Sequence, residues 1–160
     1  MKIAVTGPEC SGKTTLCKAI SRELNLTFIQ EYAREYLNDK GKNYSQYDII
    51  QIAKKQFELS QKLNSISDTE MLVCAIWYEE KTANQSPEIE ELIKKQQFDL
   101  YVLCEPSIDW EYDSLRENQH DRDRLYEKYL FRLKNLNLPF IVVKGDLTCR
   151  INMVFKHFQS

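Results

Sequence analysis

Residues 7–14 combine a glycine turn with a lysine and a hydroxyl group. They read GPECSGKT and match the pattern G-x-x-x-x-G-K-[ST] in full. Gly7 and Gly12 let the backbone wrap closely round a phosphate, so that successive amides point inward. Lys13 can then neutralise the outer phosphates, and the Thr14 hydroxyl can ligate Mg²⁺. The pattern predicts a loop that binds ATP together with Mg²⁺.

The surroundings of this loop make a chance match improbable. An apolar run over residues 2–6 precedes it, and a helix with apolar residues at helical spacing follows over residues 14–24. The positive N-terminus of such a helix faces the bound phosphates. We expect the whole loop and the start of this helix to contact the nucleotide: Gly7, Pro8, Glu9, Cys10, Ser11, Gly12, Lys13, Thr14 and Thr15.

Strands and helices alternate along the rest of the chain. Periodicity predicts further strands over residues 26–30, 100–104 and 139–143, and helices over residues 32–38, 45–63, 87–97, 121–135 and 147–158. Alternation of this kind favours an α/β fold with a parallel sheet covered on both faces. With no repeat and no linker, residues 1–160 are expected to form a single domain, with a lid-like loop at about residues 105–124.

The segment between the third and fourth predicted helices is ambiguous from its residues. Residues 71–76 read MLVCAI, which fits either a buried strand or a helix capped by Asp68 or Thr69. A metal-holding acid is also needed at the end of a second core strand. Asp68 is the best-placed candidate, and an ordinary surface aspartate is the alternative.

Composition limits the classes of partner. The formal net charge of the 160 residues is -2, which gives no global basic field for nucleic acid or an anionic membrane. No apolar run approaches the ~20 residues that span a bilayer, and no signal peptide fits before the first strand. The five cysteines include no CxxC pair. Free, mostly buried thiols and a cytoplasmic location are therefore expected.

Five blocks of the sequence carry a family resemblance. Besides the phosphate loop, they are EYAREY at 31–36, DIIQIAKKQ at 48–56, SDTE at 67–70 and DWEYDSLR at 109–116. In this order they resemble the NadR-type nicotinamide riboside kinases, a family of AAA-like P-loop proteins. The resemblance covers most of the chain. Two departures lie in the last block, where Asp109 and Ser114 replace a proline and a glycine of the family pattern.

The resemblance implies a fold and an activity. The fold would be a P-loop kinase-like three-layer sandwich with a five-stranded parallel sheet. A third strand would end at Ser67, with Asp68 at its tip, and a helix would follow over residues 71–80. The family's adenylyltransferase domain has no counterpart, because the chain has only two histidines and no HxGH motif. It would therefore act as a kinase alone.

The resemblance also favours particular roles in the acceptor site. Glu31 could take the proton of the acceptor hydroxyl, while Arg34 and Asp68 would bind substrate. Thr14 and Asp68 would hold Mg²⁺. The alternative for Glu31 and Arg34 is an ordinary ion pair at (i, i+3) on a helix.

Aromatic and charged residues of the lid-like loop complete the predicted site. Trp110 could stack on a cationic ring, with Asp113 nearby. Arg116 and Arg122 could stabilise the transferring phosphoryl group, alongside Lys13. The alternatives are a tryptophan that caps the core and a solvated charged helix start for residues 121–124.

These observations predict a kinase for a small-molecule riboside. The leading acceptor is the 5′-hydroxyl of nicotinamide riboside, which would give nicotinamide mononucleotide. A kinase for another nucleoside or small alcohol and a non-catalytic, ATP-gated binding module are the alternatives. The oligomeric state and the preference between ATP and GTP are left open by the sequence.

Overall fold

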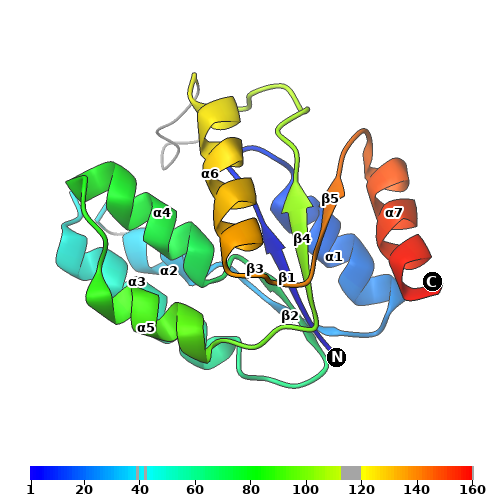
Figure 1. Ribbon diagram of the computed structural model, residues 1–160, viewed down its shortest axis with the longest axis horizontal. Helices are drawn as coiled ribbons and strands as arrows, with labels where there is room; N and C mark the ends of the chain where they lie inside the picture. Colours follow the sequence, from blue (N-terminus) through cyan, green and yellow to red (C-terminus); the bar gives the residue numbers. More distant parts are fainter. Residues whose placement is uncertain (39, 42, 113–119, 160) are drawn as a thin grey trace.

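The computed structural model describes residues 1–38, 40–41, 43–112 and 120–159. Its strands are β1 (Lys2–Thr6), β2 (Thr27–Ile29), β3 (Ser65–Asp68), β4 (Leu100–Cys104) and β5 (Phe140–Val143). They form one parallel sheet in the order β2-β3-β1-β4-β5. Figure 1 shows this sheet in the middle of the molecule with helices on both sides. The predicted α/β sandwich with a five-stranded parallel sheet is confirmed.

Two groups of helices cover the sheet (Figure 1). One face carries α1 (Lys13–Glu23) and α7 (Leu147–Gln159). The other face carries α4 (Met71–Thr82) and α6 (Arg122–Asn135). Of the remaining helices, α3 (Gln46–Leu59) and α5 (Pro87–Lys95) pack against α4, and α2 (Tyr32–Leu37) packs against α3. In the described part of the chain, no helix is long and apolar enough to span a bilayer.

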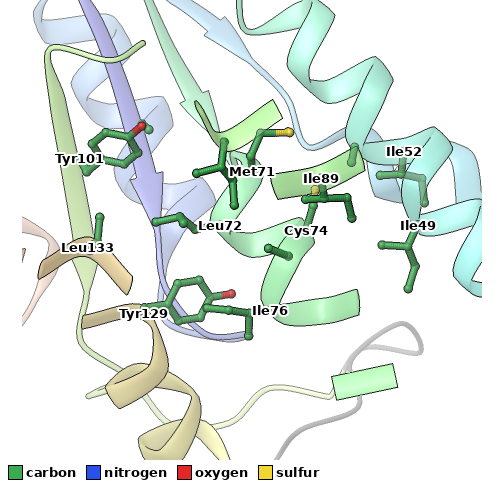
Figure 2. Close-up of a cluster of buried hydrophobic side chains, with 14 of the residues drawn as sticks. Ile49, Ile52, Met71, Leu72, Cys74, Ile76, Ile89, Tyr101, Tyr129 and Leu133 are labelled. Atoms are coloured by element: carbon green, nitrogen blue, oxygen red, sulfur yellow. The ribbon is translucent and has the colours of Figure 1, made fainter. Parts of the chain in front are cut away.

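The central strands are buried on both faces, as continuous apolar runs in parallel sheets are. Ile3 and Val5 of β1 pack in the cluster beneath α1 and α7. Tyr101 of β4 belongs to the opposite cluster, and Figure 2 shows it on the side of Leu72 and Leu133, which come from α4 and α6. Side chains that alternate between two cores fix the register of the strands. The sheet edge that carries the loops is thereby fixed as well.

The structure differs from the predicted boundaries at the end of α3. That helix ends at Leu59, earlier than the predicted residue 63. The Ser60 hydroxyl donates to the Phe57 carbonyl at 2.8 Å, and the Ser60 amide donates to the Gln56 carbonyl at 3.0 Å. The left-handed Asn64 (φ 51°) then turns the chain into β3.

The ambiguous segment over residues 71–76 is helical. Neither Asp68 nor Thr69 caps this helix, because Asp68 is the last residue of β3. The cap is Glu70, whose carboxylate accepts a hydrogen bond from the Leu72 amide at 2.7 Å. An acidic cap also suits the positive end of the helix.

The five cysteines are free thiols in different environments. Cys17, Cys74 and Cys104 are buried, as expected for small apolar residues in a core. Cys10 is half-buried in the phosphate loop, and Cys149 is exposed.

Glu70 joins the sheet to two helices. Its side chain is fully buried. It accepts hydrogen bonds from the Thr6 hydroxyl at 2.8 Å and the Gln96 side-chain amide at 3.0 Å, in addition to the Leu72 amide. Gln96 in turn accepts from the Met71 amide at 3.1 Å. The end of β1, the start of α4 and the end of α5 thus share one carboxylate.

We predict that Glu70→Ala lowers the free energy of unfolding by about 3 kcal/mol or more, because three buried donors lose their acceptor. Glu91→Ala on the exposed side of α5 is the control, since its surface ion pair with Lys94 contributes little. Urea unfolding of both variants measures the difference. Equal stability of the two variants would contradict the structural role of Glu70.

Candidate active site

The phosphate loop lies between the end of β1 and the start of α1. Gly7 and Gly12 have φ angles of 133° and 83°, in the left-handed region that glycine adopts without strain. A Cβ atom at Gly7 would lie 2.8 Å from the backbone oxygen of Cys104. Glycine is therefore required at Gly7 for two reasons, backbone conformation and close approach to β4.

Lys13 lies within the curve of this loop. Its ammonium donates hydrogen bonds to the Gly7 carbonyl at 3.0 Å and the Pro8 carbonyl at 2.7 Å. This position brings a positive charge to the start of α1, where the helix N-terminus already favours anions. The loop, Lys13 and Thr15 all line one cavity of about 650 Å³. The arrangement can hold the phosphates of a nucleotide.

Thr14 and Asp68 meet beside the loop. The Thr14 hydroxyl donates to Asp68 Oδ2 at 2.5 Å, and Asp68 is only 2% exposed. The other oxygen, Oδ1, is buried and has no hydrogen-bond partner among the described residues. Burial raises the pKa of Asp68 above its usual range, although the hydrogen bond from Thr14 acts in the opposite direction.

This pair fits the needs of a magnesium ion. Mg²⁺ binds through one or two protein oxygens and takes its other ligands from water and phosphate. Thr14 Oγ1 and the unpartnered Asp68 Oδ1 are oxygens of the required kind. No cluster of three or more His, Cys, Asp or Glu side chains that could hold a metal occurs among the described residues. Thr14 and Asp68 would supply the protein ligands of the ion, and water and the nucleotide would supply the others.

Glu31 and Arg34 line the same cavity. Glu31 is the N-cap of α2, and its carboxylate pairs with Arg34 Nε at 3.2 Å. The Thr69 hydroxyl approaches Glu31 Oε1 at 3.5 Å. Burial, and secondly the charge of Asp68, raise the pKa of Glu31. The (i, i+3) ion pair given as the alternative is present and lines the cavity, and the roles of Glu31 and Arg34 toward a substrate stay predictions.

Thr69, between Asp68 and Glu70, has an unusual backbone conformation. Its φ angle is 87°, in a region that β-branched residues rarely adopt. Such a conformation costs roughly 1–3 kcal/mol and is concentrated at functional sites. The turn leaves Asp68 beside Thr14, while the next residue, Glu70, caps α4.

The segment after β4 lies directly on the phosphate loop. The Glu111 amide donates to Cys10 Sγ at 3.3 Å, and the Cys10 thiol donates to the Asp109 carbonyl at 3.4 Å. A Cβ atom at Gly12 would lie 2.6 Å from Ile108 Cδ1. The described part of the predicted lid-like loop is thus docked against the phosphate loop.

Arg122 and Trp110 contact each other beside the phosphate loop, outside the cavity. Arg122 donates to the Ile108 carbonyl at 2.7 Å and the Cys10 carbonyl at 3.2 Å. Its guanidinium also lies 5.8 Å from the centroid of the Trp110 ring. Neither residue lines the cavity. The roles predicted for Trp110 and Arg122 remain predictions, and those for Asp113 and Arg116 fall outside the described residues.

A buried arginine of the site was missed from the sequence. Arg150 of α7 is 2% exposed, and its guanidinium donates to four acceptors in three loops. Nε donates to the Gly145 carbonyl at 2.8 Å, Nη1 to the Ser11 carbonyl, and Nη2 to the Glu105 carbonyl at 3.1 Å and the Ser107 hydroxyl at 3.0 Å. A charged residue on the apolar stripe of the last helix, in line with Val154, was the available signal.

The phosphate loop, the strand order and the docked segment after β4 define a P-loop protein with the fold of P-loop kinases. The family model described as "AAA domain" matches residues 2–150. The chain belongs to this family of AAA-domain proteins.

Its sequence relatives include two bacterial proteins. The chain is 28% identical over 155 residues to the "Trifunctional NAD biosynthesis/regulator protein NadR" of Salmonella typhimurium, which covers 89% of the chain. It is 27% identical over 157 residues to the protein of the same name from Escherichia coli, which covers 90% of the chain. The chain spans only 38% of the length of each of these relatives. The resemblance inferred from the five sequence blocks is confirmed.

Solved structures share the fold. A NadR protein in complex with NAD and AMP-PNP aligns with a TM-score of 0.77 and 20% identity, over 96% of this chain and 48% of that chain. A deoxyadenosine kinase from M. mycoides with bound dATP aligns with a TM-score of 0.70 and 20% identity, over the full length of both chains. At this identity the likeness concerns the fold.

We predict that Asp68→Asn lowers Mg²⁺-dependent turnover at least ~100-fold, because the amide cannot supply the negative charge that a metal ligand needs. Affinity for the nucleotide without metal should change little. Steady-state kinetics over a Mg²⁺ series and calorimetric titration with ATP in EDTA measure the two effects. Asp123→Asn on the exposed side of α6 is the control, and full turnover of Asp68→Asn at low Mg²⁺ would refute the assignment.

We predict that Arg150→Met weakens ATP binding at least ~10-fold and lowers the free energy of unfolding by about 3 kcal/mol, because three carbonyls, one of them buried, lose a charged donor. Arg150→Lys should recover only part of both, since one ammonium cannot reproduce the planar fork of the guanidinium. The exposed Arg22 of α1 supplies the control Arg22→Met. Titration calorimetry and urea unfolding measure the effects. Wild-type affinity for ATP in Arg150→Met would show that the arginine does not position the phosphate loop.

Proposed function

We propose that this chain is an ATP-dependent kinase that phosphorylates the 5′-hydroxyl of nicotinamide riboside and produces nicotinamide mononucleotide and ADP. The observation that carries the proposal is the convergence of three groups at one edge of the sheet. The phosphate loop, the Thr14–Asp68 pair and the Glu31–Arg34 pair come from β1, β3 and the segment after β2. Carboxyl ends of parallel strands form the ligand crevice in open α/β sheets.

The proposed chemistry assigns one task to each group. The loop amides and Lys13 bind the phosphates and neutralise their charge. Thr14 and Asp68 hold Mg²⁺, which offsets the negative charge on the outer phosphates when it is bound. Glu31 orients the 5′-hydroxyl and accepts its proton as the phosphoryl group transfers. Asp68 is occupied with the metal, so Glu31 is the carboxylate that remains for the acceptor.

The acceptor identity is supported by the NadR relatives and by one feature of the cavity. Aromatic side chains line its acceptor end, which suits a flat ring. The charges of that end are balanced, however: Glu31 and Glu80 are offset by Arg34 and Lys81. This balance favours a second candidate, a kinase for a neutral nucleoside.

A panel of acceptors distinguishes the two candidates. Purified protein, ATP and Mg²⁺ are incubated with nicotinamide riboside, uridine, cytidine or adenosine, and products are identified by mass. The proposal predicts the highest kcat/KM for nicotinamide riboside. A higher value for any neutral nucleoside would overturn the acceptor and leave the kinase assignment in place.

We predict that Glu31→Gln retains ATP binding and loses at least ~100-fold in kcat, since general base catalysis contributes roughly 10²–10⁴-fold. Because the pKa of Glu31 is raised, falling pH protonates it earlier than an ordinary glutamate. The acidic limb of the kcat/KM profile should therefore lie above pH ~4.3, the usual value for glutamate. Glu35→Gln, on the exposed side of the same helix, should leave kcat and this limb unchanged. An identical pH profile in Glu31→Gln would exclude the base role.

A further inference from the structure

The cavity extends from the phosphate loop to an aromatic end, which we define by Tyr44, Trp77 and Tyr129. Tyr44 precedes α3, Trp77 lies on α4 and Tyr129 lies on α6. Figure 2 shows the Tyr129 ring beside Ile76, which also lines the cavity. None of these aromatic residues belongs to the set predicted from the sequence. They come from three separate segments that only the fold brings together.

The length of helix α2 shows how far the cavity extends from Glu31. Glu31 at its N-cap and Leu37 at its last residue both line the cavity. Six residues of α-helix correspond to about 9 Å. The cavity therefore extends along α2 from the proposed proton acceptor toward the apolar side chains. A riboside placed with its 5′-hydroxyl at Glu31 would direct its ring to the aromatic end.

Tyr44 and Trp77 contact one another at the aromatic end of the cavity. Their ring centroids are 5.0 Å apart in an edge-to-face arrangement, and the Trp77 N–H donates to the Tyr44 hydroxyl at 2.8 Å. Lys81 lies 4.3 Å from the centroid of the Tyr44 ring. The indole N–H is thus already bonded to Tyr44. It is not offered to a ligand, which would meet the flat apolar face of the ring. Such a surface recognises a ring by stacking.

Tyr129 contributes a polar atom to this end. It is 4% exposed and lines the cavity. Burial raises the pKa of Tyr129 well above its usual value, so the phenol stays protonated and can both donate and accept. A polar group on a ligand in the cavity can exchange a hydrogen bond with this hydroxyl.

Trp110 is in a different situation. It does not line the cavity, and its ring lies against the Arg122 guanidinium. A second cation would compete for this ring and be repelled by the arginine. Trp110 is therefore poorly placed to hold a pyridinium ring.

We propose that the ring of the acceptor stacks on Trp77 at the aromatic end of the cavity, and that its polar substituent hydrogen-bonds to the Tyr129 hydroxyl. This inference rests on the proposed function, in which the acceptor is a riboside with an aromatic ring. It assigns recognition of the ring to α4 and α6 and not to the loop after β4.

Tryptophan fluorescence tests the stacking directly, because the chain has only two tryptophans. Trp110→Phe leaves Trp77 as the sole indole, and Trp77→Phe leaves Trp110. Each variant is titrated with nicotinamide riboside without ATP. Quenching is expected in Trp110→Phe and not in Trp77→Phe. Quenching confined to Trp77→Phe would overturn the inference and restore Trp110 as the stacking residue.

A pair of tyrosine variants tests the hydroxyl. Tyr129→Phe should raise the KM for the acceptor about tenfold, the effect of losing roughly 1.4 kcal/mol of binding, with kcat and the KM for ATP unchanged. Tyr126→Phe removes a hydroxyl from the same helix outside the cavity and should change none of these values. An unchanged KM for the acceptor in Tyr129→Phe would overturn the contact.

The outcome also separates this inference from the proposed function. If the acceptor panel identifies a different nucleoside, the titrations are repeated with that nucleoside. Quenching of Trp77 by it would support the aromatic end as the ring site while the nicotinamide assignment fails. Absence of Trp77 quenching by the nucleoside that the protein phosphorylates would overturn the inference whatever the acceptor is.

Discussion

The backbone of the phosphate loop is the constraint on which the site depends. Its amides can face a phosphate only if the chain turns through left-handed conformations at Gly7, Cys10 and Gly12. Two contacts hold the turn in place. The close approach of Gly7 to the Cys104 carbonyl fixes the loop against β4, and Arg150 fixes the Ser11 carbonyl from behind. The central position of β1 in the sheet follows from the same requirement, since β3 and β4 must deliver their own loops on either side.

The short segment after β3 shows how local strain serves two functions. Asp68, Thr69 and Glu70 are all buried, and the middle residue has a left-handed backbone. Asp68 faces Thr14, whereas Glu70 bonds to Thr6 at the end of β1. One carboxylate is thereby left with an unpartnered oxygen for a ligand, and the other has its hydrogen bonds satisfied within the protein. The hydrogen bonds of Glu70 stabilise the strained turn at Thr69, and this turn positions Asp68.

Much of the fold could be predicted from the sequence, because the deciding patterns are local. Periodicity and the glycine turn located β1, α1 and β4 within a residue or so. The segment over residues 71–76 was ambiguous because α4 is apolar on nearly all sides, which removes the helical period. The five-block resemblance resolved it. Tertiary contacts could not be predicted: the partners of Arg150 lie in three loops, and Trp77 meets Tyr44 from a distant segment. Trp110 was a plausible stacking residue from its loop alone, and its contact with Arg122 could not be predicted.

The central claim of this account is that the cavity transfers a phosphoryl group and does not merely bind ATP. The direct measurement is the amount of ADP and of phosphorylated riboside formed from ATP, Mg²⁺ and nicotinamide riboside, both determined by mass spectrometry. The account predicts equal amounts of the two products, dependent on the acceptor and absent in Lys13→Ala, which lacks the ammonium within the phosphate loop. ATP binding without acceptor-dependent ADP, tested across ribosides, would contradict the kinase assignment and identify an ATP-gated binding module.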